Sequence, residues 1–142
     1  MKMFWEKGII WQKYRKEKQW CVECKDKCKE GNRLIIKECD DDDDKQKWSY
    51  ENGKIRSCDK EKLCITTSGS SLKLKDCSSR RDKEQTFSGF SSLKKFQLHP
   101  KAKSSRCMSQ DHHPRNSEKL KMIDCEEAKK MMNVCTMIRA TG

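Results

Sequence analysis

Long apolar runs are missing from this sequence of 142 residues. Only 33% of its residues are hydrophobic and 39% are charged, whereas ordinary globular domains contain more apolar residues. No segment approaches the roughly 20 apolar residues of a transmembrane helix, so we expect no helical membrane span. The length fits one domain with a single core, and the composition predicts that this core is thin or reinforced by other means.

A secretory leader is also missing from the first twenty residues. The apolar run there is Gly8-Ile9-Ile10-Trp11, whereas a signal peptide needs about 7–15 apolar residues after its basic start. The ten cysteines favour the opposite compartment, because so many in a small chain are typical of a disulfide framework formed under oxidising conditions. We therefore expect a secreted or luminal protein whose sequence is a mature or truncated piece. An intracellular protein with reduced thiols is the alternative.

No nucleophile and general base occur together in a recognisable motif, so we expect neither catalysis nor a cofactor. His112 and His113 follow Asp111 in a stretch flanked by proline and serine, which is typical of a surface loop. The five consecutive carboxylates Asp40 to Asp44 point in several directions, whereas calcium needs ligands that converge on one centre. We predict a solvated loop there and no metal site.

The formal net charge of +11 is distributed unevenly. Between Leu93 and Ile123 there are eight basic residues, and the acidic residues in this segment are Asp111 and Glu118. They are Lys94, Lys95, Lys101, Lys103, Arg106, Arg115, Lys119 and Lys121. The simple interpretation is a well-solvated surface, and the alternative is a face that binds polyanions. These basic residues lack interleaved aromatic residues for stacking on bases, so nucleic acid is a disfavoured partner.

One pattern recurs three times along the chain: a cysteine, alternating apolar residues, a second cysteine and then a triplet that begins with glutamine or asparagine. The copies begin at Cys21, Cys64 and Cys107, a period of about 40 residues that is typical of one supersecondary unit repeated in series. Such a unit cannot bury its apolar face alone, so the copies are expected to share one core. They span about 1–52, 53–92 and 93–142.

Each repeat contains its own pair of cysteines, and a disulfide between the two would cross-link each repeat internally. The bridges would join Cys21 to Cys39, Cys64 to Cys77 and Cys107 to Cys125. Each would close a short loop and stabilise the fold by roughly 3 kcal/mol in the loop-entropy model. Three such bridges would matter greatly to a thin core.

The remaining cysteines, Cys24, Cys28, Cys58 and Cys135, have no assigned partners. A Cys24–Cys28 bridge, a Cys24–Cys58 bridge and free thiols are all compatible with the sequence. The spacing of Cys21, Cys24 and Cys28 also resembles part of a zinc site, which would need a fourth ligand such as Cys39 or Cys58. A Cys21–Cys39 bridge would remove that cluster.

Short segments that alternate or cluster apolar residues lie at regular spacing between turn formers such as Asn52-Gly53. They are Arg33–Lys37, Lys62–Thr66, Ser71–Lys75, Phe96–Leu98 and Lys119–Ile123. This spacing predicts an all-β sandwich or barrel. At Glu126–Met132 we expect a short turn of helix at most, because the equivalent stretches of the other repeats look like loops.

The repeated motifs resemble those of the ricin B-type lectin family over nearly the whole chain. They include Gly31-Asn32-Arg33-Leu34, Gln46-Lys47-Trp48, Gly53-Lys54-Ile55, Gln85-Thr86-Phe87 and the decayed triplet Asn133-Val134-Cys135. The resemblance implies a single β-trefoil of three pseudo-symmetric four-stranded repeats. It also implies that Trp48, Phe87 and Cys135 fill a shared core, while Gln46, Gln85 and Asn133 satisfy buried polar groups beside it.

Members of this family bind galactose-like or other sugars in a shallow pocket of each repeat, and the resemblance implies which positions would form it. The aspartate two residues after the first cysteine is replaced by Glu23, Thr66 and Ser109. The asparagine before the triplet is replaced by Lys45, Glu84 and Met132, and the stacking aromatic by Lys37, Lys75 and Ile123. No repeat keeps the full set, so the pockets are degenerate.

The first repeat keeps the best candidate sugar site, formed by Glu23, Asn32, Lys37 and Lys45, with Trp20 as a platform. We expect a non-catalytic, lectin-like monomer whose partner is a glycan or glycoconjugate. Lysines at sugar-facing positions would favour an anionic sugar or polysaccharide. The alternative is a trefoil that binds a protein or a polyanion through its basic third repeat.

Overall fold

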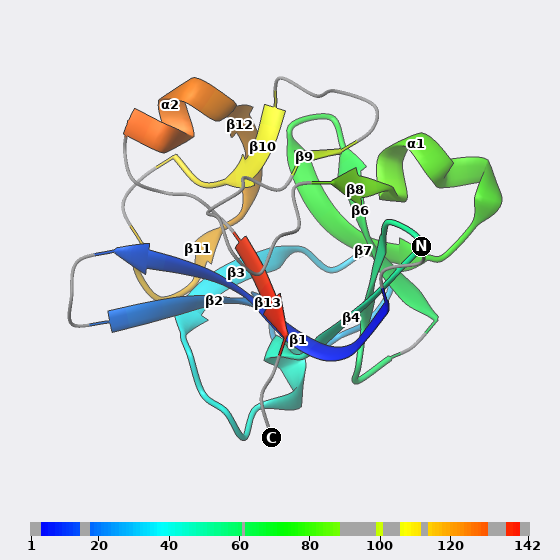
Figure 1. Cartoon of the computed structure of the whole chain (residues 1–142), viewed down its shortest axis with the longest axis horizontal. Helices are drawn as coiled ribbons and strands as arrows, with labels where there is room; N and C mark the ends of the chain where they lie inside the picture. Colours follow the sequence, from blue (N-terminus) through cyan, green and yellow to red (C-terminus); the bar gives the residue numbers. More distant parts are fainter. Residues whose placement is uncertain are drawn as a thin grey trace.

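The computed structural model describes residues 4–14, 18–60, 62–88, 99–100, 106–111, 114–130 and 136–139. Within these residues the chain is built mainly of short strands, and its blue-to-cyan, green and yellow-to-orange parts occupy different sectors around the centre (Figure 1). The strands are β1 (Phe4–Tyr14), β2 (Lys18–Cys24), β3 (Leu34–Glu38), β4 (Trp48–Glu51), β5 (Lys54–Ser57), β6 (Leu63–Ser68), β7 (Ser71–Asp76), β8 (Phe87–Ser88), β9 (His99–Pro100), β10 (Arg106–Ser109), β11 (Glu118–Lys119), β12 (Lys121–Asp124) and β13 (Thr136–Arg139). The helical turns are η1 (Asp44–Gln46), η2 (Ser79–Arg81), α1 (Asp82–Gln85) and α2 (Cys125–Lys130). The predicted all-β class is confirmed.

The strand segments expected from the sequence coincide with β3, β6, β7 and the pair β11–β12, whereas Phe96–Leu98 lies outside the described residues. In β7, Leu72 and Leu74 are fully buried while Ser71, Lys73 and Lys75 are partly exposed. This alternation is the period-two pattern of a half-buried strand. The Asn52-Gly53 turn joins β4 to β5 with positive φ at both residues, as a tight hairpin requires.

Two features differ from the sequence-based expectations. Segment 4–14 forms β1 although charged residues interrupt its apolar run, because β2, β4 and β13 all pair with its backbone. Helical turns rather than plain loops precede the triplets of the first two repeats, and α2 begins one residue earlier than the expected helical turn. The Asp124 carboxylate accepts hydrogen bonds from the backbone N–H groups of Glu126 and Glu127, which caps the start of α2.

Three β-hairpins, β2–β3, β6–β7 and β10–β12, close into a triangle. Backbone hydrogen bonds connect the three sides: Gly31 N to Leu74 O (2.7 Å), Met122 N to Ser70 O (2.7 Å) and Leu120 N to Leu34 O (2.9 Å). Each hairpin therefore pairs with both of the others. This closed threefold arrangement is the hairpin layer of a β-trefoil, as the sequence predicted.

The core contains side chains from all three repeats. Trp48 and Phe87 belong to one buried cluster together with Leu34, Leu72 and Leu120, which hold equivalent positions in the three hairpins. Trp48 and Phe87 are exposed by no more than 1%, and the Trp48 indole Nε1–H donates to Val22 O over 3.1 Å. Cys135, the expected third member, lies outside the described residues, as does Asn133.

The Gln46 side chain acts as a clamp on the backbone around Cys39. Its Nε2 donates to Glu38 O (3.0 Å) and to the Glu23 carboxylate (3.1 Å), and its Oε1 accepts from Asp40 N (2.8 Å). Glu38 and Asp40 flank Cys39, and Glu23 lies two residues after Cys21. The glutamine thereby satisfies polar groups that the Cys21–Cys39 region would otherwise leave unpaired.

Gln85 forms the same clamp in the second repeat. Its Nε2 donates to Asp76 O (2.8 Å) and Thr66 Oγ1 (3.0 Å), and its Oε1 accepts from Ser78 N (2.9 Å). The amide side chain of Gln85 is fully buried, so each of these bonds replaces contact with water. The equivalence of the two clamps is independent evidence that the repeats share one design.

Four disulfides connect the described cysteines. They are Cys21–Cys39, Cys24–Cys28, Cys64–Cys77 and Cys107–Cys125. Three of these join the two cysteines of one repeat, and the fourth closes a tight loop before β3. The described chain also contains Cys58, which is half-buried.

The first and third repeats are joined by a buried pair of amides. Gln12 Nε2 donates to Gln110 Oε1 (2.7 Å) and Gln110 Nε2 donates back to Gln12 Oε1 (2.8 Å). Both side chains are fully buried, so this reciprocal bond fixes β1 against the turn after β10.

Among the described residues no helix has the length and apolar character needed to cross a membrane.

Replacing Gln85 with leucine tests the clamp. The substitution leaves the part-buried Asp76 carbonyl and Ser78 N–H without their partner, so the free energy of unfolding should fall by about 1–3 kcal/mol. Urea denaturation followed by circular dichroism measures it. The control is Gln19→Leu at an exposed position of β2, for which little change is expected. Equal effects of the two substitutions would contradict the clamp.

Candidate functional site

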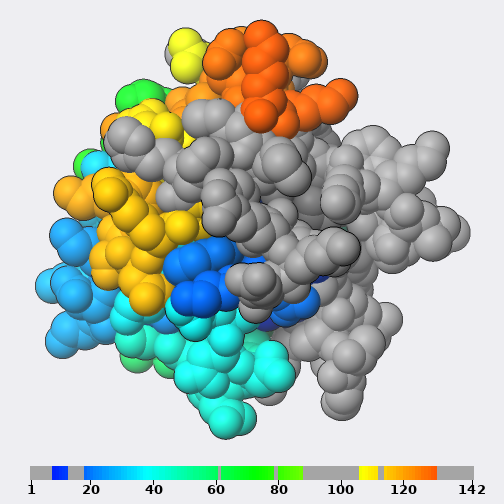
Figure 2. All heavy atoms as spheres, turned by 90° about the vertical axis from the view of Figure 1, so that its left-hand side faces the viewer, coloured from blue at the N-terminus to red at the C-terminus, as the bar shows by residue number. Residues whose placement is uncertain are grey.

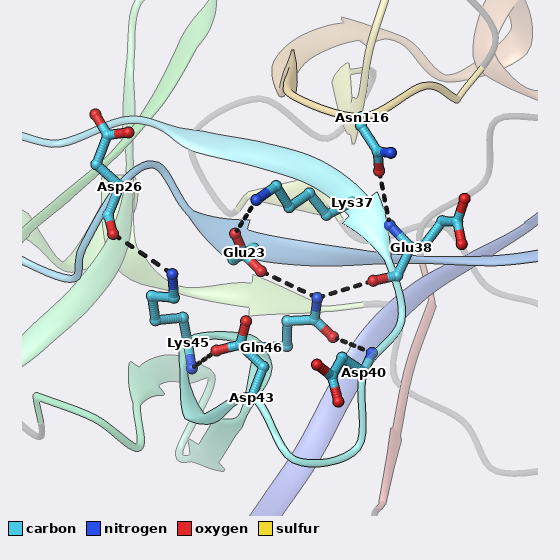
Figure 3. A network of polar contacts seen from close by, with 9 residues as sticks. All are labelled: Glu23, Asp26, Lys37, Glu38, Asp40, Asp43, Lys45, Gln46 and Asn116. Atoms are coloured by element: carbon cyan, nitrogen blue, oxygen red, sulfur yellow. Dashed lines mark hydrogen bonds and ion pairs between the residues drawn. The ribbon is translucent and has the colours of Figure 1, made fainter.

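Three of the expected sugar-binding residues, Glu23, Lys37 and Lys45, lie around the Gln46 clamp (Figure 3). Glu23 is on β2 and Lys37 on the neighbouring strand β3, and the Lys37 Nζ lies 3.6 Å from the Glu23 carboxylate. The Glu23 side chain is only 2% exposed, whereas that of Lys37 is 42% exposed. A sugar hydroxyl at the surface would therefore meet the lysine before it could reach the carboxylate.

Several interactions shift the pKa of the Glu23 carboxyl, some upward and some downward. Burial is the largest and raises the pKa of Glu23 above its ordinary value. The hydrogen bond from Gln46 lowers this pKa, a hydrogen bond with Asp43 raises it, and the charge of Lys37 lowers it. The net result is a raised pKa. Glu23 is thus a member of the clamp, in the place that the neutral Thr66 hydroxyl holds in the second repeat.

Lys45 immediately precedes the first triplet, and its side chain extends toward Asp26. Its backbone N–H donates to the Asp43 carboxylate (2.9 Å), which caps η1, and its Nζ donates to Asp26 O (3.5 Å). The sequence predicts Asp43 as one of five solvated carboxylates, yet it is half-buried. The sequence did contain the signal: an aspartate three residues before a glutamine matches a helix-capping box.

Asn32 stabilises the loop beside the site through its side-chain amide. Its side-chain amide donates to Lys25 O (3.1 Å) and Lys27 O (2.9 Å) and so shapes the loop that contains Asp26. Asp26 has a φ of 63°, in the left-handed region that asparagine and aspartate tolerate best. Asn32 therefore orders the loop toward which Lys45 extends, while the structure brings Glu23, Lys37 and Lys45 together around Gln46.

The expectation of Trp20 as a sugar platform is wrong. Its side chain is part of the buried core, with 7% exposure, and the Lys18 ammonium lies 5.8 Å from its ring centre. Core packing and a cation together cover the faces that a sugar ring would need. The sequence could not reveal this, because an isolated tryptophan before a cysteine fits a core position and a surface platform equally well.

The second and third repeats keep fewer side chains that could bind a sugar. Thr66 and Ser109 are buried, and Thr66 is engaged by Gln85. Lys75 and Ile123 occupy the positions of the stacking aromatic, and Glu84 is exposed on α1. Met132 lies outside the described residues, as do His112 and His113.

The cysteines considered as zinc ligands are oxidised in this structure. Cys21 is bonded to Cys39 and Cys24 to Cys28, so these sulfurs cannot act as thiolate ligands. Within the described part of the chain no group of three or more histidine, cysteine, aspartate or glutamate side chains is arranged to hold a metal ion. In the Asp40–Asp44 loop, coloured cyan at the lower edge of Figure 2, only Asp43 is half-buried.

A family model described as the ricin-type β-trefoil lectin domain matches residues 10–132. The chain belongs to this family. The match covers most of the described strands and includes the Gln46 and Gln85 clamps. The family resemblance that the sequence motifs indicated is confirmed.

Solved structures share the fold of this ricin-type domain at low sequence identity. The β-trefoil lectin of the Vibrio vulnificus hemolysin/cytolysin, solved with N-acetyl-D-lactosamine bound, is 12% identical with a TM-score of 0.69, covering 96% of both chains. A non-toxic homologue of type II ribosome-inactivating proteins from Momordica charantia (bitter gourd), in complex with α-methyl-D-galactoside, is 15% identical with a TM-score of 0.69, covering 96% of this chain and 48% of that one. The mdaA-1 domain is 11% identical, with a TM-score of 0.68 over 87% of this chain and 85% of that one. A comparison with curated protein sequences finds no significant match.

The buried carboxyl of this ricin-type trefoil should make its stability depend on pH. The folded state holds the Glu23 proton more tightly than the unfolded chain, so this group lowers stability as the pH rises from the ordinary value of 4.5 through the raised pKa. Glu23→Gln removes the titration but keeps an oxygen to accept from Gln46. Its melting temperature relative to wild type should therefore rise with pH across that window and level off above it.

Circular dichroism melting curves measured at intervals from acidic to neutral pH make this test. Glu30→Gln, which removes an exposed carboxylate from the loop before β3, is the matched control for lost charge. A constant difference between Glu23→Gln and wild type at every pH would show that the Glu23 carboxyl titrates alike in the folded and unfolded chains.

Proposed function

We propose that this protein is a non-catalytic, carbohydrate-binding module whose sugar site in the first repeat has diverged from the family pattern. The observation that carries the proposal is the family match over residues 10–132 on a chain that keeps two intact glutamine clamps. The two sugar-bound structures of similar fold support the same class of function.

The proposed site is the exposed edge of the first repeat, where Lys37 and Lys45 extend past the Gln46 clamp (Figure 3). Ammonium groups donate hydrogen bonds and accept none, so this site favours sugars that present oxygen acceptors, carboxylates included. It lacks an aromatic platform at position 37, and Glu23 is engaged inside the protein. Both departures predict weak binding, with a dissociation constant of about 1 mM for a monosaccharide.

The four disulfides support a place outside the reducing cytosol. A secreted or luminal lectin meets glycans on cell surfaces and glycoproteins, which agrees with the proposed partner class. The bridges also compensate for the low apolar content of the chain.

Screening the oxidised protein on an array of neutral and acidic glycans tests the function. Specific binding is expected, and Lys45→Ala should weaken the best hit about tenfold, because it removes a charged hydrogen-bond donor. Isothermal titration calorimetry quantifies the loss. Lys60→Ala, which removes an exposed lysine between β5 and β6, is the control and should retain full affinity. An array without specific hits, or identical affinities of both variants, would contradict the proposal.

A further inference from the structure

The triangle of hairpins brings six residues together in three cross-strand pairs. Arg33 lies opposite Lys73, Ser71 opposite Lys121, and Ile35 opposite Lys119. Directly opposed residues have their Cβ atoms about 5 Å apart and on the same face. Four of the six positions are basic, and they come from all three repeats. We name Arg33, Lys73, Lys119 and Lys121 the basic ring.

The strand pattern places the four basic residues on the opposite side of their strands from the core leucines, and Ile35, which pairs with Lys119, is itself buried. The residues between the ring positions, Leu34, Leu72 and Leu120, are fully buried. Lys119 is exposed, Arg33 and Lys73 are half-buried, and the Lys121 side chain is 38% exposed. Partly buried lysines of this kind pack their aliphatic stems on the protein and keep their ammonium groups in water. Residues 114–124, yellow to orange in Figure 2, form part of the molecular surface beside blue and cyan residues of the first repeat.

The charges of the basic ring are compensated only in part by the described acidic residues. Lys121 pairs with Asp111, whereas the nearby Glu118 pairs with Arg115. Arg33, Lys73 and Lys119 form no ion pair with any residue that the structure describes. Like charges directly opposite each other destabilise a sheet, so the Arg33–Lys73 pair works against folding.

Arg33 lies where the three repeats meet. Its backbone pairs with Lys73 of the second repeat, and its Nη2 donates to Leu120 O of the third repeat over 3.2 Å. Its Nε is buried and has no hydrogen-bond partner among the described residues. Buried donors are nearly always paired in folded proteins, so the Arg33 guanidinium is incompletely compensated, and an anion beside Arg33 and Lys73 would offset both positive charges.

We propose that the basic ring binds a linear acidic polysaccharide carrying sulfate or carboxylate groups. Its cations lie on outward-facing strand residues, a geometry suited to a chain of spaced anionic groups. No aromatic residue occurs among the six positions, which disfavours nucleic acid because stacking platforms are missing. The four disulfides agree with an extracellular polysaccharide. The basic ring does not include Lys37 or Lys45, so the proposal goes beyond the sugar binding proposed at that edge.

Heparin is the probe for this site, and the variant Arg33→Gln/Lys73→Gln is the first test. Its affinity for heparin in 0.15 M salt should fall at least tenfold, on the order expected for two lost cation–anion contacts, and the slope of log K against log salt should fall by about 1.5 to 2. Its melting temperature without heparin measures the balance between the relieved like-charge pair and the lost hydrogen bond from Arg33 to Leu120 O. Lys60→Gln/Lys83→Gln removes two exposed lysines elsewhere and should match wild type in affinity.

A second variant, Lys73→Gln/Lys119→Gln, leaves the Arg33 hydrogen bond to Leu120 intact and should show the same loss. Equal heparin affinities of the ring variants and the control pair would overturn the proposal, as would absence of heparin binding by the wild type. Duplex DNA that competes as well as heparin at equal charge would overturn the assignment to a polysaccharide. Neutral glycans on the array report on the Lys37–Lys45 edge, so failure of either site can be told apart from failure of the other.

Discussion

The buried amide of the triplet glutamine is the contact on which this fold depends. In each of the two described copies it ties the residue after the second cysteine to the residue before it, and both to the strand of the first cysteine. The Cys21–Cys39 and Cys64–Cys77 disulfides lie beside these two glutamines, because the glutamines bond the residues that flank Cys39 and Cys77. Because the core is thin, covalent and hydrogen-bonded constraints act together where apolar packing alone would be weak. The aromatic ring two residues later is then directed into the shared centre.

Much of the fold could be predicted because the sequence repeats one pattern of cysteines, apolar residues and triplets about every 40 residues. The recurring cysteine pairs and triplets indicated three similar units, and units of this kind have few ways to share a core. β1 escaped prediction since its residues follow no apolar pattern of their own, and two of its three partners, β4 and β13, lie far along the sequence. Local pattern carries no information about such partners. The helical turns η1 and α2 were underestimated for a smaller reason: each depends on one capping aspartate.

The candidate site was harder to predict than the fold, because position in a motif does not fix the direction of a side chain. Glu23 stands where family members have a sugar-contacting aspartate, but its longer side chain reaches the clamp amide instead. Thr66 makes the equivalent contact with a hydroxyl, so the clamp itself does not require a charge. The sequence grouped Glu23, Lys37 and Lys45 in one predicted site and the structure brings these three residues together, while the burial of Glu23 and Trp20 followed only from packing.

The pairing of β1 with β13 links two segments near opposite ends of the sequence. Contacts between residues so distant in the chain are slow to form, because a long loop must lose its entropy before the strands gain their hydrogen bonds. During synthesis β1 can pair with β2 and β4 early, but its pairing with β13 must wait until Thr136–Arg139 have been synthesised. Until then one edge of the first strand stays unpaired and open to strand exchange with another nascent copy.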